Sequence, residues 1–341
     1  MSVSASEVGR PERRPVANPV RRRARRIDGV VLLDKPLGMS SNHAMLAVRR
    51  LLSAAKAGHG GTLDPMASGL LPILLGEATK FAGDALDSDK TYLATLRLGE
   101  LSSTADAEGE ITPTGHPLPD LSQVESVLAR FRGTIEQVPP MHSALKHAGR
   151  PLYELARQGA NVERAPRTIT IHTLTRVGLE GARLTIRVVC SKGTYIRVLA
   201  QDIGDALGCG AWLSDLRREG AAGLSLDHGS VTLDALAQMS ELERDQCVQP
   251  ADRLLDGLNR IDLPPEWAPR FLSGQRLRLA APVRADRADI EQSSTLDICR
   301  VRVYGSRDSQ SSSPVLLGLA HLHDGLLIPL RLISTQDQDS P

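Results

Sequence analysis

The sequence predicts an α+β fold, in which a mainly antiparallel mixed sheet carries inserted helices and is followed by a small β-rich C-terminal domain. Residues 91–98, 167–177 and 182–190 have the alternation and composition of strands. Residues 121–131 have apolar side chains at helical spacing along one side. The pattern shows no strict βαβ repetition, so a parallel sheet between two helical layers is not expected.

The N-terminal part of the main domain is predicted to run through a strand, a helix, a loop and a second strand. Residues 29–33 form an apolar run typical of a buried strand. Ser40 or Ser41 is a suitable N-cap for a helix that extends to about Leu52. After a glycine-rich loop, the apolar run at 70–75 predicts another buried strand, with a short helix following it.

Changes in composition along the chain set the expected domain boundaries. Residues 1–26 hold eight arginines and two glutamates without an apolar period, which predicts a disordered Arg-rich arm. The main domain is then expected at 27–231, a helical connection at 232–258 and the β-rich domain at 259–335. In this last domain, a turn at 324–325 between two apolar runs indicates a hairpin.

Length and composition exclude several classes of protein. With 341 residues, the chain can bury a full core without disulfides or structural metals. Its four cysteines have no paired spacing, so neither a zinc site nor a disulfide framework is predicted. No apolar run approaches the length that spans a bilayer. We therefore expect a cytoplasmic protein that binds no metal and no membrane.

The most informative stretch is the glycine-rich loop at 58–69, which surrounds a single carboxylate, Asp64. Glycines allow positive φ angles and let the backbone approach a ligand, while Pro65 fixes the turn after the acid. This pattern favours a loop that presents Asp64 to a ligand. The same residue types are also typical of a plain surface turn, in which Asp64 would only cap the backbone.

Residues 58–81 closely resemble the signature of the TruB family of pseudouridine synthases, which isomerise a uridine in the T arm of transfer RNA. Four further matches lie in the family's order: GVVLLDKPLG at 29–38, KTY at 90–92, PPMHSALK at 139–146 and CSKGTYIR at 190–197. The resemblance covers roughly residues 27–220. It implies the pseudouridine synthase fold for the main domain and a PUA-like RNA-binding domain at 259–335.

The resemblance makes Asp64 the catalytic carboxylate. A carboxylate beside the anomeric carbon can form a covalent sugar ester or can remove the C2′ proton to give a glycal, and the residues do not distinguish these routes. Either route needs Asp64 in its ionised form, which a neighbouring cation favours.

Two further family positions complete the expected active site. Arg197 matches the arginine that pairs with the carboxylate, near the start of a helix that Thr194 is expected to cap and Gly208 to end. Its guanidinium can bind a carboxylate through two hydrogen bonds, whereas an ordinary surface ion pair is the alternative. Tyr92 matches the tyrosine that stacks on the flipped-out base, with core packing as its alternative.

Three more residues match family positions that contact the substrate or close its pocket. His59 is expected near the flipped nucleotide, as an RNA contact or as part of the loop structure. Lys35 is a candidate contact to a phosphate or to the loop, with a solvated lysine as the alternative. Leu216 corresponds to an apolar residue that closes the pocket, a role compatible with ordinary packing of a strand.

The sequence departs from the family pattern at three positions. Gly60 and Ser68 stand where threonines are usual, and His142 stands where a tyrosine is common. The two short side chains would change the rigidity of the loop without removing the carboxylate. A histidine packed beneath the site would place there a polar ring that needs a partner.

We therefore predict a monomeric, cofactor-free tRNA pseudouridine synthase of the TruB type, acting on the uridine at position 55. Twelve basic and seven acidic residues between 142 and 220 favour an RNA-facing surface there. One alternative is an RNA chaperone with weak or lost isomerase activity, which would use Tyr92 but not Asp64 or Arg197. Another is a glycosidase or nucleosidase, although no second catalytic acid stands out. Convergence of Asp64, Tyr92 and Arg197 in one cleft would favour the isomerase.

Overall fold

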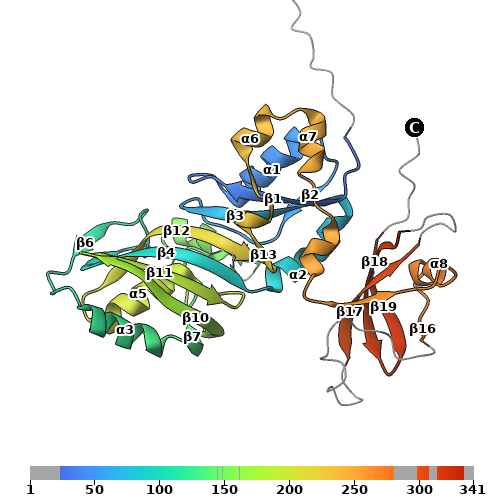
Figure 1. Cartoon of the computed structure of the whole chain (residues 1–341). Helices are drawn as coiled ribbons and strands as arrows, with labels where there is room; N and C mark the ends of the chain where they lie inside the picture. Colours follow the sequence, from blue (N-terminus) through green and yellow to red (C-terminus); the bar gives the residue numbers. More distant parts are fainter. Residues whose placement is uncertain are drawn as a thin grey trace, which may run out of the picture.

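The computed structural model shows a large sheet with attached helices and a smaller, separate sheet at the C-terminus (Figure 1). The structure describes residues 24–143, 145–147, 149–160, 162–279, 298–306 and 313–333. Within them, no helix is long and apolar enough to cross a membrane.

The large sheet is mixed and mainly antiparallel, as predicted. Its central strands, in spatial order, are β14 (Val231–Thr232), β1 (Gly29–Lys35), β3 (Ala67–Leu75), β12 (Ala211–Ala221), β4 (Lys90–Leu98), β11 (Arg183–Cys190), β10 (Arg167–Glu180) and β7 (Gly133–Gln137). Two short strands extend it: β13 (Leu224–Ser225) pairs with β12, and β2 (Ala57–His59) pairs with β3. The β1–β14 and β3–β12 pairs are parallel, and the others are antiparallel. The predicted α+β class is confirmed.

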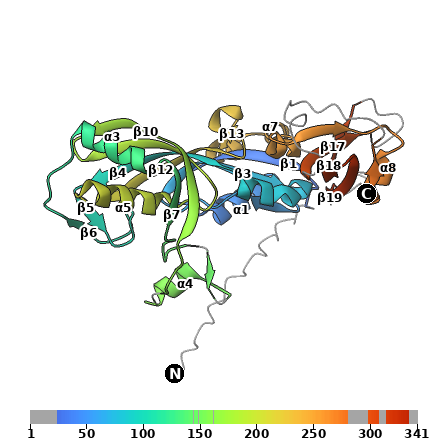
Figure 2. The same ribbon diagram turned by 90° about the horizontal axis from the view of Figure 1, so that it is seen from below.

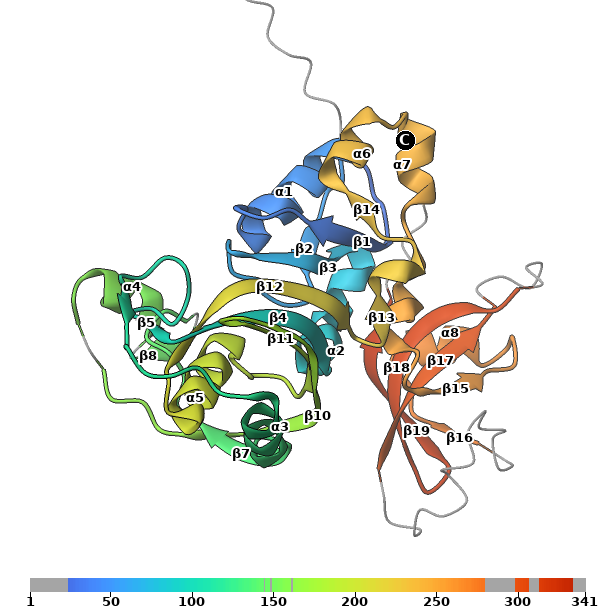
Figure 3. The same ribbon diagram turned by 60° about the vertical axis from the view of Figure 1, so that its left-hand side comes forward.

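Helices occupy the connections between these strands. In chain order they are α1 (Ser41–Leu51), η1 (Gly76–Phe81), α2 (Ala82–Asp87), α3 (Leu121–Arg130), α4 (Leu152–Arg157), α5 (Ile196–Leu207), η2 (Leu226–His228), α6 (Leu233–Gln238), α7 (Glu241–Gln246) and η3 (Ala251–Leu255). Two small ladders lie in loops, β5 (Glu100–Ser102) with β6 (Ile111–Pro113), and β8 (Lys146–His147) with β9 (Arg150–Pro151). The views in Figures 1 and 3 place α1, α6 and α7 near β1, and α3 and α5 near β10 and β12.

Local sequence signals account for the helix ends. The Ser40 hydroxyl accepts a hydrogen bond from the His43 amide at 3.2 Å and so caps α1. Gly208 ends α5 in the left-handed region, with φ of 74°. The expected cap by Thr194 is wrong, because Tyr195 occupies the N-cap position of α5 and the Thr194 hydroxyl donates instead to the Ser191 carbonyl at 2.9 Å.

The C-terminal module is a five-stranded sheet with one short helix. In spatial order its strands are β15 (Asn259–Asp262), β17 (Cys299–Gly305), β18 (Val315–His323), β19 (Leu326–Leu332) and β16 (Leu277–Arg278), and the helix is α8 (Ala268–Leu272). The predicted turn at Asp324 and Gly325 joins β18 to β19, with φ of 47° and 67°. Residues 280–297 and 307–312 lie outside the described residues.

The C-terminal module packs directly against the large domain (Figure 2). Tyr304 and Leu316 of the module belong to the same buried cluster as Leu32 of β1. An ion pair of 2.6 Å between Arg300 and Asp84 crosses the same boundary. The apolar and polar contacts together fix the module relative to the main sheet.

The N-terminal arm joins the body earlier than its predicted end at residue 26. Residues 1–23 of the arm lie outside the described residues. Arg25 forms an ion pair of 2.6 Å with Asp245 of α7, and its carbonyl accepts a hydrogen bond from the Ala55 amide at 2.8 Å. The final residues of the predicted arm are therefore part of the folded domain.

Candidate active site

Asp64 lies in the loop between β2 and β3, and hydrogen bonds fix the backbone on both sides of it. The Ser41 hydroxyl, at the start of α1, accepts from the Leu63 amide at 2.7 Å and donates to the Leu63 carbonyl at 2.9 Å. On the other side of the acid, the Gly38 amide donates to the Pro65 carbonyl at 2.7 Å. The loop therefore presents Asp64 from a defined backbone, while 41% of its side chain stays exposed.

Arg197, the second residue of α5, bridges two carboxylates. Its Nη2 atom lies 3.0 Å from Oδ2 of Asp64, and its Nη1 atom lies 3.4 Å from Oδ2 of Asp106. Nη2 also donates to the His142 carbonyl at 2.8 Å. The side chain is only 6% exposed, so the two acids compensate a buried charge. The guanidinium can bind one carboxylate through two hydrogen bonds, but here it divides its contacts between two carboxylates.

Asp106 is a site residue that the sequence motifs do not indicate. Its side chain is 5% exposed. Oδ1 accepts hydrogen bonds from the Thr104 hydroxyl at 2.5 Å and from the Glu108 amide at 3.0 Å. These bonds hold the carboxylate in place independently of Arg197. In the sequence, Asp106 looks like one of several polar loop residues, since its partner is far away along the chain.

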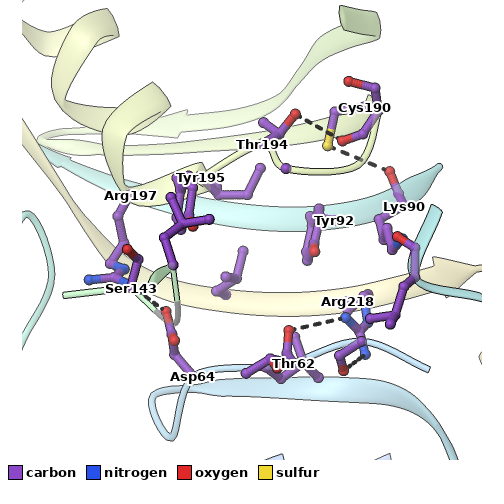
Figure 4. Close-up of a pocket in the computed structure, with 18 of the residues that line it drawn as sticks. Thr62, Asp64, Lys90, Tyr92, Ser143, Cys190, Thr194, Tyr195, Arg197 and Arg218 are labelled. Atoms are coloured by element: carbon purple, nitrogen blue, oxygen red, sulfur yellow. Dashed lines mark hydrogen bonds and ion pairs between the residues drawn. The ribbon is translucent and has the colours of Figure 1, made fainter. Parts of the chain in front are cut away.

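Asp64 and Arg197 lie at one end of a cavity of about 360 Å³, which Tyr92 and Leu216 also line (Figure 4). This volume falls within the range of small-ligand sites. Tyr92 of β4 is 9% exposed, and burial raises the pKa of its phenol. Leu216 of β12 is opposite Ala94 in the β4–β12 pairing, and 6% of it is exposed. The expected convergence of Asp64, Tyr92 and Arg197 in one cleft is present in the structure.

The opposite end of the cavity contains two buried cations, Arg218 and Lys90 (Figure 4). Arg218 of β12 is 1% exposed and Lys90 of β4 is 8% exposed. Burial, followed by the charge of Arg218, lowers the pKa of Lys90 to about 8. Leu216 and Arg218 are two residues apart on one strand and face the same side, whereas Arg217 faces away and pairs with Asp34 at 2.7 Å. This alternation is the sequence signal that could have identified Arg218.

Lys35 does not reach the cavity. It is 0% exposed, and its ammonium donates hydrogen bonds to the carbonyls of Pro36 and Met39 at 2.9 and 2.7 Å. Burial, followed by the charge of Arg218, lowers its pKa to about 8. Of the two contacts expected of Lys35, to a phosphate or to the loop, the structure shows the one to the loop, because the ammonium is enclosed by the turn that it stabilises.

His59 ends β2 and is not among the residues that line the cavity. Its ring is partly buried, and burial, followed by the charge of Arg218, lowers its pKa. Nδ1 has no hydrogen-bond partner among the described residues. Of the two expected roles, this placement favours a part in the loop structure over direct contact with a base in the cavity.

Comparison with known proteins decides the family. A model of the "TruB family pseudouridylate synthase (N terminal domain)" matches residues 49–196, and a model of the "tRNA pseudouridylate synthase B C-terminal domain" matches residues 197–256. A tRNA pseudouridine synthase B from Burkholderia lata is 50% identical over 330 residues, which cover 97% of this chain and 98% of that protein. The chain belongs to the TruB family of pseudouridine synthases. The predicted resemblance is confirmed.

Other TruB relatives and solved structures agree with this assignment. A tRNA pseudouridine synthase B from Burkholderia mallei is 51% identical over 319 residues, covering 93% of this chain and 98% of that one. A chain from the crystal structure of a Cbf5-Nop10-Gar1 complex is 26% identical, with a TM-score of 0.65 over 86% of this chain and 78% of its own. A chain from an H/ACA RNP bound to a substrate RNA containing 2′-deoxyuridine has 24% identity and a TM-score of 0.67, over 91% of this chain and 86% of its own, and shows the fold alone.

The three departures from the usual TruB pattern have separate physical explanations. A Cβ atom on Gly60 would lie 2.9 Å from Cβ of Ala85, so a larger residue there would push α2 away. The Ser68 hydroxyl is 3.4 Å from Nη1 of Arg217 and accepts a hydrogen bond from it. His142 is exposed, so its ring needs no buried partner, and it supplies only its backbone carbonyl to the arginine of α5.

Proposed function

We propose that this TruB-family enzyme isomerises uridine to pseudouridine at position 55 in the T arm of tRNA, with Asp64 as the catalytic carboxylate. The observation that carries the proposal is the convergence of a partly exposed acid, a buried cation and an aromatic ring in one cavity. The name tRNA pseudouridine synthase B, which relatives about half identical to this chain bear, supports tRNA as the substrate.

The chemistry needs an acid next to the ribose and a surface for the extruded base. Asp64, with 41% of its side chain exposed, can reach a ribose that enters the cavity, and the Arg197 guanidinium, 3.0 Å away, orients the carboxylate. Tyr92 offers an aromatic face that replaces part of the stacking lost when the uridine leaves the T arm. Asp64 then either attacks C1′ to give an ester or removes the C2′ proton to give a glycal.

The remaining parts of the molecule support binding of RNA. The C-terminal five-stranded module serves, in this proposal, as a PUA-like RNA-binding domain, held at a fixed distance from the cavity by its packing on the main sheet. Phosphate contacts by basic residues make the binding dependent on salt. The enzyme would act as a monomer in the cytoplasm and without a cofactor.

The direct test measures tritium release from C5-labelled uridine in unmodified tRNA, with no metal or nucleotide added. The wild-type enzyme is expected to release the label, and Asp64→Asn is expected to lose at least about 1,000-fold in rate, because an amide is a poor nucleophile and a poor base. Full release by Asp64→Asn would contradict the proposed role.

A tRNA annealing assay on the same variant separates the enzyme from an RNA chaperone. We expect Asp64→Asn to bind and anneal tRNA like the wild type, since its loop backbone is held by bonds that do not involve the carboxylate. A wild-type protein that anneals tRNA but releases no tritium would favour the chaperone and overturn the proposal.

A further inference from the structure

Arg218 is a buried cation in the wall of the cavity, and no carboxylate is paired with it. It is 1% exposed, and within the described part of the chain it forms no ion pair. A buried charge without a counter-ion is costly, so its place in a ligand cavity calls for an explanation. Lys90, also buried at this end, adds a second positive charge.

A count of hydrogen-bond donors distinguishes the two cations. The Lys90 ammonium has three N–H groups and donates to three carbonyls, those of Ala85, Leu86 and Ser88, at 3.1, 2.7 and 2.6 Å. The Arg218 guanidinium has five N–H groups. Three of these reach the carbonyls of Gly61, Thr62 and Leu70, at 3.2, 3.4 and 2.7 Å. The Tyr92 phenol also hydrogen-bonds Arg218. Arg218 therefore keeps one N–H group for a neighbour in the cavity, and Lys90 contributes only its charge.

The strand pairing places the free part of Arg218 beside the stacking surface. Arg218 and Tyr92 are direct partners in the antiparallel β12–β4 pairing. A Cβ atom on Gly61 would lie 3.4 Å from Nη1 of Arg218, so the absence of a side chain there leaves this edge of the guanidinium open. Figure 4 shows Tyr92 between the two ends of the cavity, with Asp64 and Arg197 toward one end and Arg218 and Lys90 toward the other.

We infer that Arg218 is a further catalytic residue, which hydrogen-bonds the uracil ring and stabilises its negative charge once the glycosidic bond has broken. The inference rests on the proposed function. With the ribose at Asp64 and the base on Tyr92, the carbonyl oxygens of the uracil extend toward the end of the cavity that holds Arg218. A positive, pre-positioned donor in a water-poor site stabilises developing charge strongly.

The bonds and electrons balance without any other reagent. The C1′–N1 bond breaks, and its electron pair moves onto the uracil ring and its carbonyl oxygens. Asp64 either bonds to C1′ or takes the C2′ proton. After the ring rotates, C5 bonds to C1′; in the same step the ester bond to Asp64 breaks, or Asp64 returns its proton to C2′. The C5 proton is then lost to water and N1 takes up one proton, so the reaction consumes no net proton. Arg218 stays protonated throughout and only donates hydrogen bonds.

The test compares leaving groups. A T-arm stem–loop RNA is prepared with uridine or 5-fluorouridine at the target position, and loss of the parent nucleoside is followed by chromatography under single-turnover conditions. Fluorine withdraws electrons and stabilises the uracil anion by itself. Arg218→Gln should therefore slow the reaction of uridine by about 100-fold, as expected for loss of a charge-stabilising donor. The factor by which it slows the reaction of 5-fluorouridine should be several-fold smaller.

Control variants separate this role from a structural one. Arg187→Gln removes an arginine from strand β11, on the other side of β4 from Arg218. Arg187 pairs with Glu219 at 2.8 Å and does not line the cavity, so this variant should keep both rates. If Arg218→Gln proves unfolded in thermal denaturation, Arg218→Lys keeps the charge and should show a smaller loss with the same dependence on the leaving group.

The outcomes are distinct. An equal loss on both RNAs, or no loss on either, would show that Arg218 only supports the loop at Gly61 and would overturn the inference, while the proposed function would stand. Failure of the wild type to convert uridine would instead overturn the proposed function.

Discussion

Removal of the Asp106 carboxylate is the most direct test of how the active-site arginine is positioned. Asp106→Asn keeps the size of the side chain and can still accept the bonds from Thr104 and Glu108. It removes one of the two negative charges that hold Arg197, which is 6% exposed. The positive charge is then balanced by Asp64 alone, together with the His142 carbonyl.

The expected loss of stability follows from the distance between the two charged groups. Unit charges 3.4 Å apart attract by about 5 kcal/mol at an effective dielectric constant of about 20. Desolvation offsets part of this attraction, and Asp64 remains as a partner of Arg197. We therefore expect the free energy of unfolding to fall by roughly 2 kcal/mol, measured by urea denaturation.

The expected loss of activity follows from the freedom that Arg197 and Asp64 gain. A displacement of about 1 Å in a catalytic group can cost about 100-fold in rate. Single-turnover tritium release by Asp106→Asn should therefore fall by about 10- to 100-fold, while the affinity for tRNA stays within about twofold, because the Asp106 side chain is buried.

Asp245→Asn is the matched control. Asp245 pairs with Arg25 at 2.6 Å on the surface, with 35% of its side chain exposed, and we expect a loss below about 1 kcal/mol and an unchanged rate. A wild-type rate for Asp106→Asn would refute the idea that the second carboxylate positions Arg197.

Two further predictions concern the sheet beneath the cavity. Gly69→Ala should lower the free energy of unfolding by roughly 3 kcal/mol or more, because its φ is 101° and a Cβ would lie 2.2 Å from the Arg218 carbonyl oxygen. Gly83 has open space around it, so Gly83→Ala should leave the free energy of unfolding unchanged. Equal effects of the two variants in urea denaturation would contradict this prediction. The lowered pKa of Lys90, about 8 against an ordinary 10.5, means that the unfolded chain holds the proton more tightly, so the folded state gains stability as pH rises from about 8 to 10.5. In this pH window the free energy of unfolding of the wild type should therefore rise by up to about 1.4 kcal/mol per pH unit relative to that of Lys90→Met. The control is Lys56→Met, at an exposed position. A difference between wild type and Lys90→Met that does not change with pH, or an equal rise relative to Lys56→Met, would show that Lys90 is not the cause.

Much of the fold could be predicted because strands and helices depend on local patterns. The alternation at 91–98 and 182–190 became β4 and β11, and the helical spacing at 121–131 became α3. The residues that cap the helices were harder to predict. Ser40 caps α1 as expected, whereas Thr194 does not cap α5, because its hydroxyl finds the Ser191 carbonyl one turn earlier.

The candidate site could be predicted only where a residue's own motif marked it. Asp64, Tyr92, Arg197 and Leu216 were all indicated by the family resemblance, and all line one cavity. Lys35 belongs to an equally clear motif, but the ammonium turns back to the carbonyls of its own loop. A motif identifies a residue type at a position, and it does not show which way a long side chain points.

The sequence by itself therefore predicted the family, the order of the strands and helices along the chain, and Asp64 as the acid that lines the cavity. The tertiary structure alone decided that Asp106 shares Arg197 with Asp64, and that Arg218 lies buried beside Tyr92 without a carboxylate partner among the described residues. The physical reason is that these contacts join segments far apart in the chain. The energies of these contacts depend on the distances and the burial reached after folding, and a local sequence pattern contains information on neither.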